Sequence, residues 1–317
     1  MTSKQFTPPT AEQRTKALGD TSKLDTDLLH ALTVGINESF LPIPVPNDGD
    51  WLSIYEESGQ TLKQFEKTKR TRPHSTYRTI YVQPIGECNH PRAPSLETIC
   101  EFSSHFFPGC LVEILPSIDF DSKTMKQRLN PYTNQPQYLT TNLIDHLKKM
   151  QRKRSRDRRE LFCVGITMAD IYPRSSWNFV YGIASIEDGV GIYSFARLDP
   201  MFPGTPDDQF PCTEEERLLI LKRAIGVFVH EVIHLFGLEH CIYYLCLMNG
   251  TNNGEEMDGQ PLYLCPVCLR KMYSSLNGKT NPFDVKKIYR GISDLCRKLN
   301  FKDEMDWYEN RLRMLDV

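Results

Sequence analysis

One stretch of eleven residues constrains this chain more than any other. From position 230 to position 240 it reads His-Glu-Val-Ile-His-Leu-Phe-Gly-Leu-Glu-His. His230 and His234 are four residues apart, so on a helix they lie on the same face and can hold one ion together. Imidazole nitrogens suit zinc. Glu231 follows the first histidine, where its carboxylate can reach a metal-bound water without binding the metal itself.

A third histidine strengthens this interpretation against its alternative, two ordinary histidines on a helix surface. Gly237 lets the chain turn sharply, because glycine accepts a positive φ at little cost. The turned chain can bring His240 back as a third nitrogen ligand. Three protein ligands leave a fourth position open for water, which distinguishes catalytic zinc from structural zinc. The pattern therefore favours a catalytic type of zinc site.

The first two histidines are predicted to lie near the end of a long helix. Residues 213–216 read Thr-Glu-Glu-Glu, a capping box that marks a helix start. We expect the helix to run to about Phe236, with Gly237 as an αL cap at its end.

Ten cysteines are many for a chain whose first residues contain no apolar signal segment. We therefore expect a cytoplasmic, reducing location, where clustered cysteines are metal ligands and scattered ones are small core residues. A Cys-x-x-Cys pair is a common half of a metal site, and four thiolates saturate a tetrahedral zinc. The alternative is four unrelated buried thiols. The candidate ligands of this second, structural zinc are Cys241, Cys246, Cys265 and Cys268.

The rest of the chain has alternating strand and helix signals from about residue 76 onward. Residues 1–75 are rich in Thr, Pro and polar side chains and are expected to form an extension with one short helix within 24–40. Residues 116–138 are expected to be irregular. The predicted strands are 79–85, 110–115, 161–167, 177–184 and 191–197, and the predicted helices are 94–107, 142–150, 281–300 and 302–317.

Composition and charge exclude two classes of protein. No run of about 18 apolar residues is present, so no membrane partner is expected. The chain has 38 basic and 40 acidic residues, so a generally basic nucleic-acid binder is not expected. One local basic run could bind phosphates or RNA or permit nuclear import, but a solvated helix end is the favoured interpretation, because charge runs usually have no binding role. This run contains Lys148, Lys149, Arg152, Lys153, Arg154, Arg156, Arg158 and Arg159.

The whole metal-ligand pattern resembles that of the archaemetzincins, a family of the metzincin clan of zinc metallopeptidases. Cys241 follows the third histidine directly, and Cys246, Met248 and the Cys265-to-Cys268 pair come next. The stretches 164–167, 177–179 and 191–197 are also similar to that family. The resemblance covers about 76–273 and is faint in 1–75 and 278–317. Sixteen residues separate Met248 from Cys265, one fewer than in the family pattern, which a loop can absorb.

The resemblance implies a compact α/β domain with a twisted mixed sheet and a zinc helix. It places the catalytic domain at 76–277, after an N-terminal extension at 1–75 and before C-terminal helices at 278–317. It makes Glu231 the catalytic base and Met248 the methionine turn, a hydrophobic floor under the metal. It also implies two zinc ions, one catalytic and one structural. Their ligands are His230, His234 and His240 for the first and Cys241, Cys246, Cys265 and Cys268 for the second.

The expected reaction is peptide hydrolysis. Zinc lowers the pKa of its bound water to about 7, and Glu231 takes the proton and passes it to the leaving nitrogen. An edge strand would hold the substrate by main-chain pairing, and 191–197 or its neighbour 177–184 is the candidate. The sequence leaves exopeptidase and endopeptidase activity open, while the resemblance implies aminopeptidase-like activity on peptides. An aminopeptidase needs a carboxylate for the substrate's free amine. The candidates are Asp170, Glu187, Asp188 and Glu239.

Two other classes of function stay open at this point. The protein could be a zinc-bound peptide-binding module with little catalysis, although the intact Glu231 argues against this. It could also be a nucleic-acid adaptor that uses the four-cysteine site together with the basic run. Salt-dependent binding of RNA or DNA, lost when residues 152–159 are neutralised, would favour the adaptor. The sequence does not indicate an oligomeric state.

Overall fold

The computed structural model describes residues 6–34, 39–74, 76–154, 160–204, 212–279 and 281–316. The chain divides into two compact units. Residues Arg70–Phe236 form one, which we call the sheet unit, and Met1–Lys69 together with Gly237–Val317 form the other, which we call the helical unit. This division differs from the three segments expected above, whose boundaries stay a prediction.

A five-stranded mixed sheet organises the sheet unit, with the strand order β2-β1-β5-β8-β7. Neighbouring strands are parallel except for β7, which pairs antiparallel with β8. The mixed α/β fold class expected from the sequence is confirmed. The strands are β1 (Thr79–Pro84), β2 (Leu111–Ile114), β5 (Glu160–Thr167), β7 (Gly182–Ser185) and β8 (Val190–Ser194).

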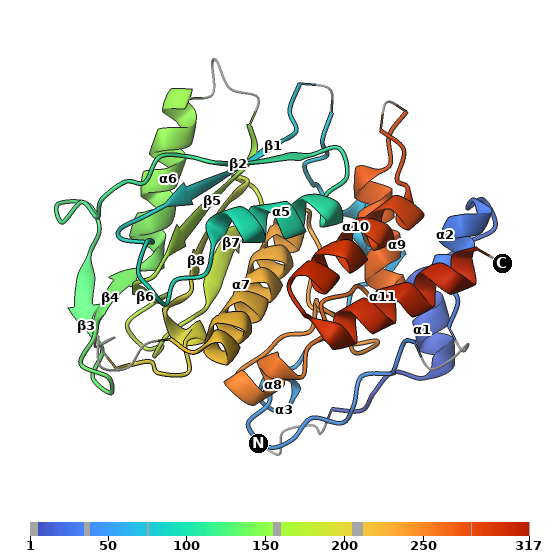
Figure 1. Ribbon diagram of the computed structural model, residues 1–317, viewed down its shortest axis with the longest axis horizontal. Coiled ribbons are helices and arrows are strands. Elements are labelled where there is room, and N and C mark those ends of the chain that lie inside the picture. Colours follow the sequence, from blue (N-terminus) through green and yellow to red (C-terminus); the bar gives the residue numbers. More distant parts are fainter. Residues whose placement is uncertain are drawn as a thin grey trace. The chain divides into compact units, whose positions relative to one another are not determined.

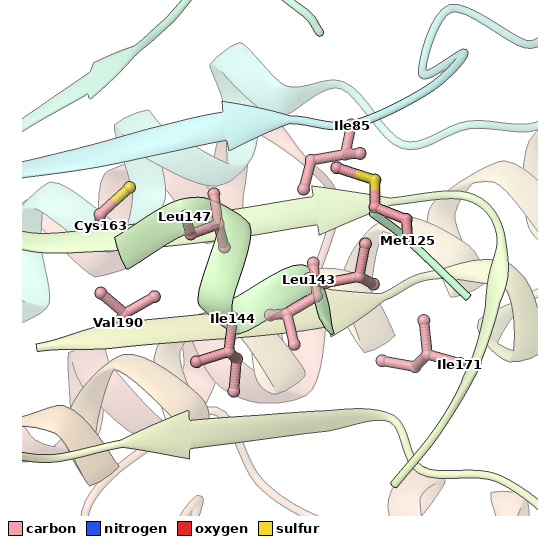
Figure 2. Packing of buried hydrophobic residues seen from close by; sticks show 9 residues of the cluster. Ile85, Met125, Leu143, Ile144, Leu147, Cys163, Ile171 and Val190 are labelled. Carbon is pink, nitrogen blue, oxygen red and sulfur yellow. The ribbon is translucent and has the colours of Figure 1, made fainter. Parts of the chain in front are cut away.

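Helices cover both faces of this sheet, and the alternation of side chains along each strand explains which residue meets which helix. On one face α6 (Thr140–Arg154) packs against Cys163 and Val190 of the central strands (Figure 2). Ile192 belongs to the same buried cluster. The opposite face carries α5 (Leu96–Phe106) and α7 (Glu214–Leu235), as Figure 1 shows. There the rings of Phe162 and Phe236 meet edge to face, with centroids 4.9 Å apart. The apolar run in β5 is therefore buried on both sides, as predicted.

A second, small sheet corrects one expectation. Its order is β3-β4-β6, and its strands are β3 (Gln127–Leu129), β4 (Pro136–Leu139) and β6 (Asp170–Tyr172). The expectation that 116–138 is irregular was wrong for β3 and for most of β4. The strands β3 and β4 have only three and four residues, too few to show a detectable alternation.

The long helix α7 begins as its sequence predicts. The Thr213 side chain accepts a hydrogen bond from the Glu216 amide at 3.1 Å, and the Glu216 carboxylate accepts one from the Thr213 amide at 3.0 Å. Gly237 follows the helix with a φ of 92°, which confirms the expected turn residue. The sheet unit thus ends where the chain leaves this helix.

The helical unit contains the N-terminal residues as ordered structure. Arg311, which is fully buried, donates hydrogen bonds to the carbonyls of His30 and Ala31 at the end of a short helix. The Trp307 ring stacks on Tyr263 with centroids 3.9 Å apart. The two predicted C-terminal helices are confirmed with shorter bounds, as α10 and α11. The helices of this unit are α1 (Ala11–Leu18), α2 (Thr26–Ala31), α3 (Trp51–Ile54), α4 (Leu62–Lys67), α8 (Gly254–Asp258), α9 (Pro266–Leu276), α10 (Val285–Lys298) and α11 (Lys302–Leu315).

Within the residues that the structure describes, no helix has the length and apolar character needed to cross a membrane.

Candidate metal centres

The first two histidines of the motif converge on α7. The Nε2 atoms of His230 and His234 lie 3.0 Å apart, and their rings meet edge to face. His230 is 9% exposed and His234 is half-buried. Two nitrogen ligands on a tetrahedral zinc with bonds of about 2.0–2.1 Å would be about 3.3 Å apart. The two Nε2 atoms would therefore need to move apart only slightly to bind one metal ion together.

Glu231 lies beside the sheet edge. A Cβ atom added at Gly182 of β7 would come within 3.2 Å of the Glu231 carboxyl carbon and within 2.4 Å of the Tyr193 ring. Glycine at this position therefore lets the strand approach the carboxylate closely. Burial, and then the charge of Glu231, raise the pKa of Tyr193 well above its usual value. The carboxylate predicted as the base thus sits against the first residue of β7.

The sheet topology corrects the choice of edge strand. Residues 191–197 were one candidate, but β8 lies between β5 and β7 and is an internal strand. The other candidate, 177–184, contributes its last residues to β7, which ends the five-stranded sheet in the described part of the chain. A continuous apolar run such as 190–194 is typical of an internal strand, and the half-buried β7 is typical of an edge.

The four cysteines form a closed cluster in the helical unit. Their sulfur atoms all lie within 4.8 Å of one another, and Cys241 and Cys265 are 3.6 Å apart. All four residues are at most 2% exposed. Cys265 caps the start of α9, and Cys268 lies in the first turn of that helix. Four converging, buried thiols with no open side fit a tetrahedral structural metal site.

Backbone groups around the cluster are arranged to stabilise charge on sulfur. The amides of Cys265 and Met248 donate to the Cys246 sulfur at 3.3 Å and 3.5 Å. Burial opposes ionisation of Cys241, yet hydrogen bonds from the other three thiols hold its pKa well below the usual value. Burial raises the pKa of Cys265 well above it. A bound cation would stabilise all four sulfurs as thiolates.

Asn249 is a residue of this loop that the sequence analysis missed. Its amide group donates to the carbonyls of Cys241 and Tyr244 at 2.7 Å and 2.9 Å, and its oxygen accepts from the Cys246 amide at 2.8 Å. The Asn249 side chain therefore fixes the loop that carries the first two cysteines. A single asparagine after Met248 has no pattern that would distinguish it.

His240 and Met248 belong to the helical unit. Met248 is fully buried, and its carbonyl accepts a hydrogen bond from the Cys241 amide at 2.6 Å. This bond ties Met248, the predicted methionine turn, to the residue directly after His240. The Nδ1 atom of His240 lies 2.7 Å from a carboxylate oxygen of Glu57, a residue that the sequence analysis did not single out. Glu57 is 183 positions away in sequence, so no local spacing could have indicated it.

Two of the carboxylates considered for an aminopeptidase site are already engaged. Asp170 is buried and forms a two-pronged ion pair with Arg197, with distances of 2.8 Å. Asp188 pairs with Lys148 at 2.6 Å. Glu187 is exposed in the turn after β7, at the opposite end of that strand from Gly182. Glu239 is exposed and belongs to the helical unit.

The basic run is only partly described. Its first residues end α6, where Lys148 pairs with Asp188 and Arg154 contacts Glu160 at 3.3 Å. Arg156, Arg158 and Arg159 lie outside the described residues. Cations at the end of this helix are therefore used at least in part for ion pairs within the fold. Nucleic-acid binding by the run stays an untested prediction.

Comparisons with known proteins point in one direction. A model of peptidase family M54 matches residues 112–274. Archaemetzincin-2 of Pongo abelii is 36% identical over 281 residues, which cover 81% of this chain and 76% of the relative. Archaemetzincin-2 of Homo sapiens is 36% identical over 279 residues, covering 81% and 74%. Archaemetzincin-1 of Homo sapiens is 30% identical over 245 residues, covering 70% and 48%.

Solved structures give a more distant likeness. A crystal structure of archaemetzincin from Archaeoglobus fulgidus in complex with malonate has a TM-score of 0.44 and 26% identity, and covers 61% of this chain and 99% of that chain. A zinc-dependent peptidase from Methanocorpusculum labreanum has a TM-score of 0.47 and 22% identity, with the same coverage. From the family match and the curated relatives, this chain belongs to the archaemetzincin family, peptidase family M54, and is a zinc metallopeptidase.

Proposed function

We propose that this peptidase cleaves peptide bonds at a zinc ion held by His230, His234 and His240, with Glu231 as the general base. The observation that carries the proposal is on α7, where two histidine Nε2 atoms converge to 3.0 Å beside a carboxylate at the sheet edge. The donor set of three imidazoles suits zinc and leaves a position open. His240 follows the end of the helix closely in sequence, across the turn at Gly237.

Zinc in such a site supplies Lewis acidity and makes water acidic enough to react near neutral pH. Glu231 accepts the proton of the attacking water and delivers it to the leaving nitrogen. Its place against Gly182 supports this role, because the carboxylate then lies beside the first residue of the edge strand β7. A peptide that adds to the outer edge of β7 would be held by main-chain hydrogen bonds.

We also propose a second, structural zinc at the four cysteines. This part is supported by the donor set, because four buried thiols within 4.8 Å match the tetrahedral sites that thiolates form around zinc. Met248 is proposed as the hydrophobic floor of the catalytic site. Its complete burial, and the bond from its carbonyl to the Cys241 amide, suit a residue that packs rather than reacts.

Removal of N-terminal residues from peptides is the proposed mode of cleavage. Among the four carboxylates considered for the free amine, Glu239 is the one that this proposal retains. Asp170 would have to give up its pair with Arg197, and Glu187 and Asp188 lie in the turn at the far end of β7. Glu239 directly precedes a proposed ligand and is exposed. The proposed substrates are peptides, in a cytoplasmic location that the basic run would extend to the nucleus.

The test is cleavage of a diverse peptide library, read by mass spectrometry, by the wild type and by Glu231→Gln. We expect products from the wild type alone, while the variant keeps its zinc, because the substitution removes only the base. Products shortened by one N-terminal residue would support trimming, and internal cuts would replace it with endopeptidase activity. Equal cleavage by both proteins would overturn the role of Glu231. No cleavage by either zinc-loaded protein would leave a peptide-binding protein.

A further inference from the structure

Residues 49–60 of the N-terminal segment lie against His240 in the helical unit. The Nδ1 atom of His240 lies 2.7 Å from Glu57 Oε1, and the Trp51 indole nitrogen donates to the same oxygen at 2.6 Å. The Trp51 and His240 rings meet edge to face with centroids 5.0 Å apart. One carboxylate oxygen thus joins an imidazole and an indole.

These contacts determine which nitrogen of His240 is available. An ionised carboxylate can only accept hydrogen bonds, so the hydrogen of a neutral His240 lies on Nδ1. Its Nε2 atom then carries the free lone pair that a metal requires. Histidines that bind metals commonly donate their other ring N–H to a carboxylate, which fixes both the tautomer and the orientation of the ring.

The backbone just before His240 is held by the same N-terminal segment. Gln60 is buried, and its amide group donates to the Gly237 carbonyl at 3.1 Å while its oxygen accepts from the Glu239 amide at 3.4 Å. A Cβ at Gly59 would come within 2.6 Å of the Ile242 side chain, so this approach is close. Residues 59–60 therefore bind the turn that places His240.

The segment is also anchored on the residues that follow the methionine turn. The Trp51 amide donates to both carboxylate oxygens of Glu256, at 3.0 Å and 3.1 Å. A Cβ at Gly250 would lie 2.5 Å from the Trp51 ring, so glycine there makes room for the indole. The Asn252 side chain donates to the Gly49 carbonyl at 2.9 Å. Trp51 is thus held firmly enough to orient Glu57.

We propose that Glu57 is a positioning residue for the catalytic metal, and that it presents His240 Nε2 as the third ligand with the help of Trp51 and Gln60. The N-terminal segment 49–60 is then part of the metal centre. This inference rests on the proposed function, since it takes His240 as a zinc ligand.

The test measures zinc affinity of the full chain by chelator competition, with the cobalt-substituted absorption spectrum as a second readout. Glu57→Ala is expected to weaken the histidine site by about 10- to 100-fold and to change the cobalt spectrum, because the ring loses its orienting partner. Glu57→Gln is expected to retain most of the affinity, since its amide oxygen still accepts from Nδ1–H. The control is Glu56→Ala, which removes an exposed neighbouring carboxylate and should leave affinity unchanged.

A Glu57→Ala protein that binds zinc as tightly as Glu56→Ala would overturn the inference. Should Glu57→Ala fail to fold, Trp51→Phe decides, because it keeps an aromatic ring beside Gly250 and removes only the N–H donor to Glu57. Affinity equal to the wild type in Trp51→Phe would then contradict the proposal. His230→Ala distinguishes a failure of this inference from a failure of the proposed function. If it also leaves the zinc content unchanged, the histidine metal site itself is wrong, and the proposed function fails with it.

Discussion

The four-cysteine cluster and the histidine pair offer metal ligands in opposite ways. The cysteines are buried and lie on a loop and a helix start of one unit, and the Cys246 sulfur accepts two backbone hydrogen bonds. His230 and His234 lie near the end of α7. Glu231, which lies between them in sequence, and His234 are both half-buried. A saturated, buried donor set can only hold the fold together, whereas an incomplete set beside a carboxylate can act on a substrate. This difference predicts that loss of the cysteine site lowers the stability of the protein, whereas loss of the histidine site lowers its peptidase activity.

The largest expected effect is on stability at the cysteine cluster. Cys268→Ala removes one of four ligands, and structural zinc contributes on the order of 10 kcal/mol to folding in small zinc domains. We expect a large loss of thermal stability and of helical circular dichroism. Cys296→Ala is the matched control, because Cys296 is equally buried in α10 but lies outside the cluster. Equal melting temperatures for the two variants would contradict a structural role for the cluster.

At the histidine centre we expect substitutions to affect the rate of peptide hydrolysis more than the stability of the protein. His234→Ala should lower peptide hydrolysis by about 10³-fold or more, because the Lewis acid contributes several kcal/mol to the reaction. The melting temperature should change much less than in Cys268→Ala. Zinc analysis should find one ion fewer per chain. His30→Ala, an exposed histidine at the end of α2, serves as the control for both readouts. A His234→Ala protein that unfolds as readily as Cys268→Ala would break the distinction between the centres.

A smaller effect is expected where β7 approaches Glu231. Gly182→Ala places a methyl group 2.4 Å from the buried Tyr193 ring, and such overpacking costs about 1–3 kcal/mol. Hydrolysis should fall as well, because Glu231 is crowded from the same position. Denaturant unfolding and steady-state kinetics measure the two effects. Gly259→Ala is the control, since its added methyl group meets only ordinary contacts at 3.6 Å or more. Wild-type activity in Gly182→Ala would argue that the close approach of β7 to Glu231 has no part in catalysis.

The smallest effect concerns the helix that carries the histidines. Thr213→Ala removes the capping hydrogen bond at the start of α7 and should lower the free energy of unfolding by about 1 kcal/mol. Zinc affinity should not change, because His230 and His234 lie near the other end of the helix. Thr213→Ser keeps the hydroxyl and should restore stability. A change in zinc affinity with Thr213→Ala would mean that the histidine pair depends on the whole helix.

Local chemistry explains why some of this structure was predictable. The capping box at Thr213 marks the start of α7 and the positive φ at Gly237 marks its end, both where expected. Each signal depends only on neighbouring residues. The apolar run of β5 likewise identified a strand buried on both faces. The order of strands in the sheet depends on distant pairings, which explains why 191–197 was taken for an edge.

The candidate site follows the same rule. The histidines and cysteines are evident from their spacing, since metal ligands must converge and short loops fix how they can do so. Glu57 and Asn249 were missed because their roles come from hydrogen bonds to other segments. Residues proposed to orient metal ligands are therefore harder to recognise in a sequence than the proposed ligands themselves.

The most direct test of the account is hydrolysis measured while zinc is removed in steps by a chelator. Two ions per chain are predicted, and the histidine centre should release its zinc first. Activity should disappear with the first equivalent removed, while the melting temperature falls steeply only with the second. One equivalent of added zinc should restore activity. Full activity after loss of the first ion, together with an early loss of stability, would contradict the assignment of chemistry to the histidines and stability to the cysteines.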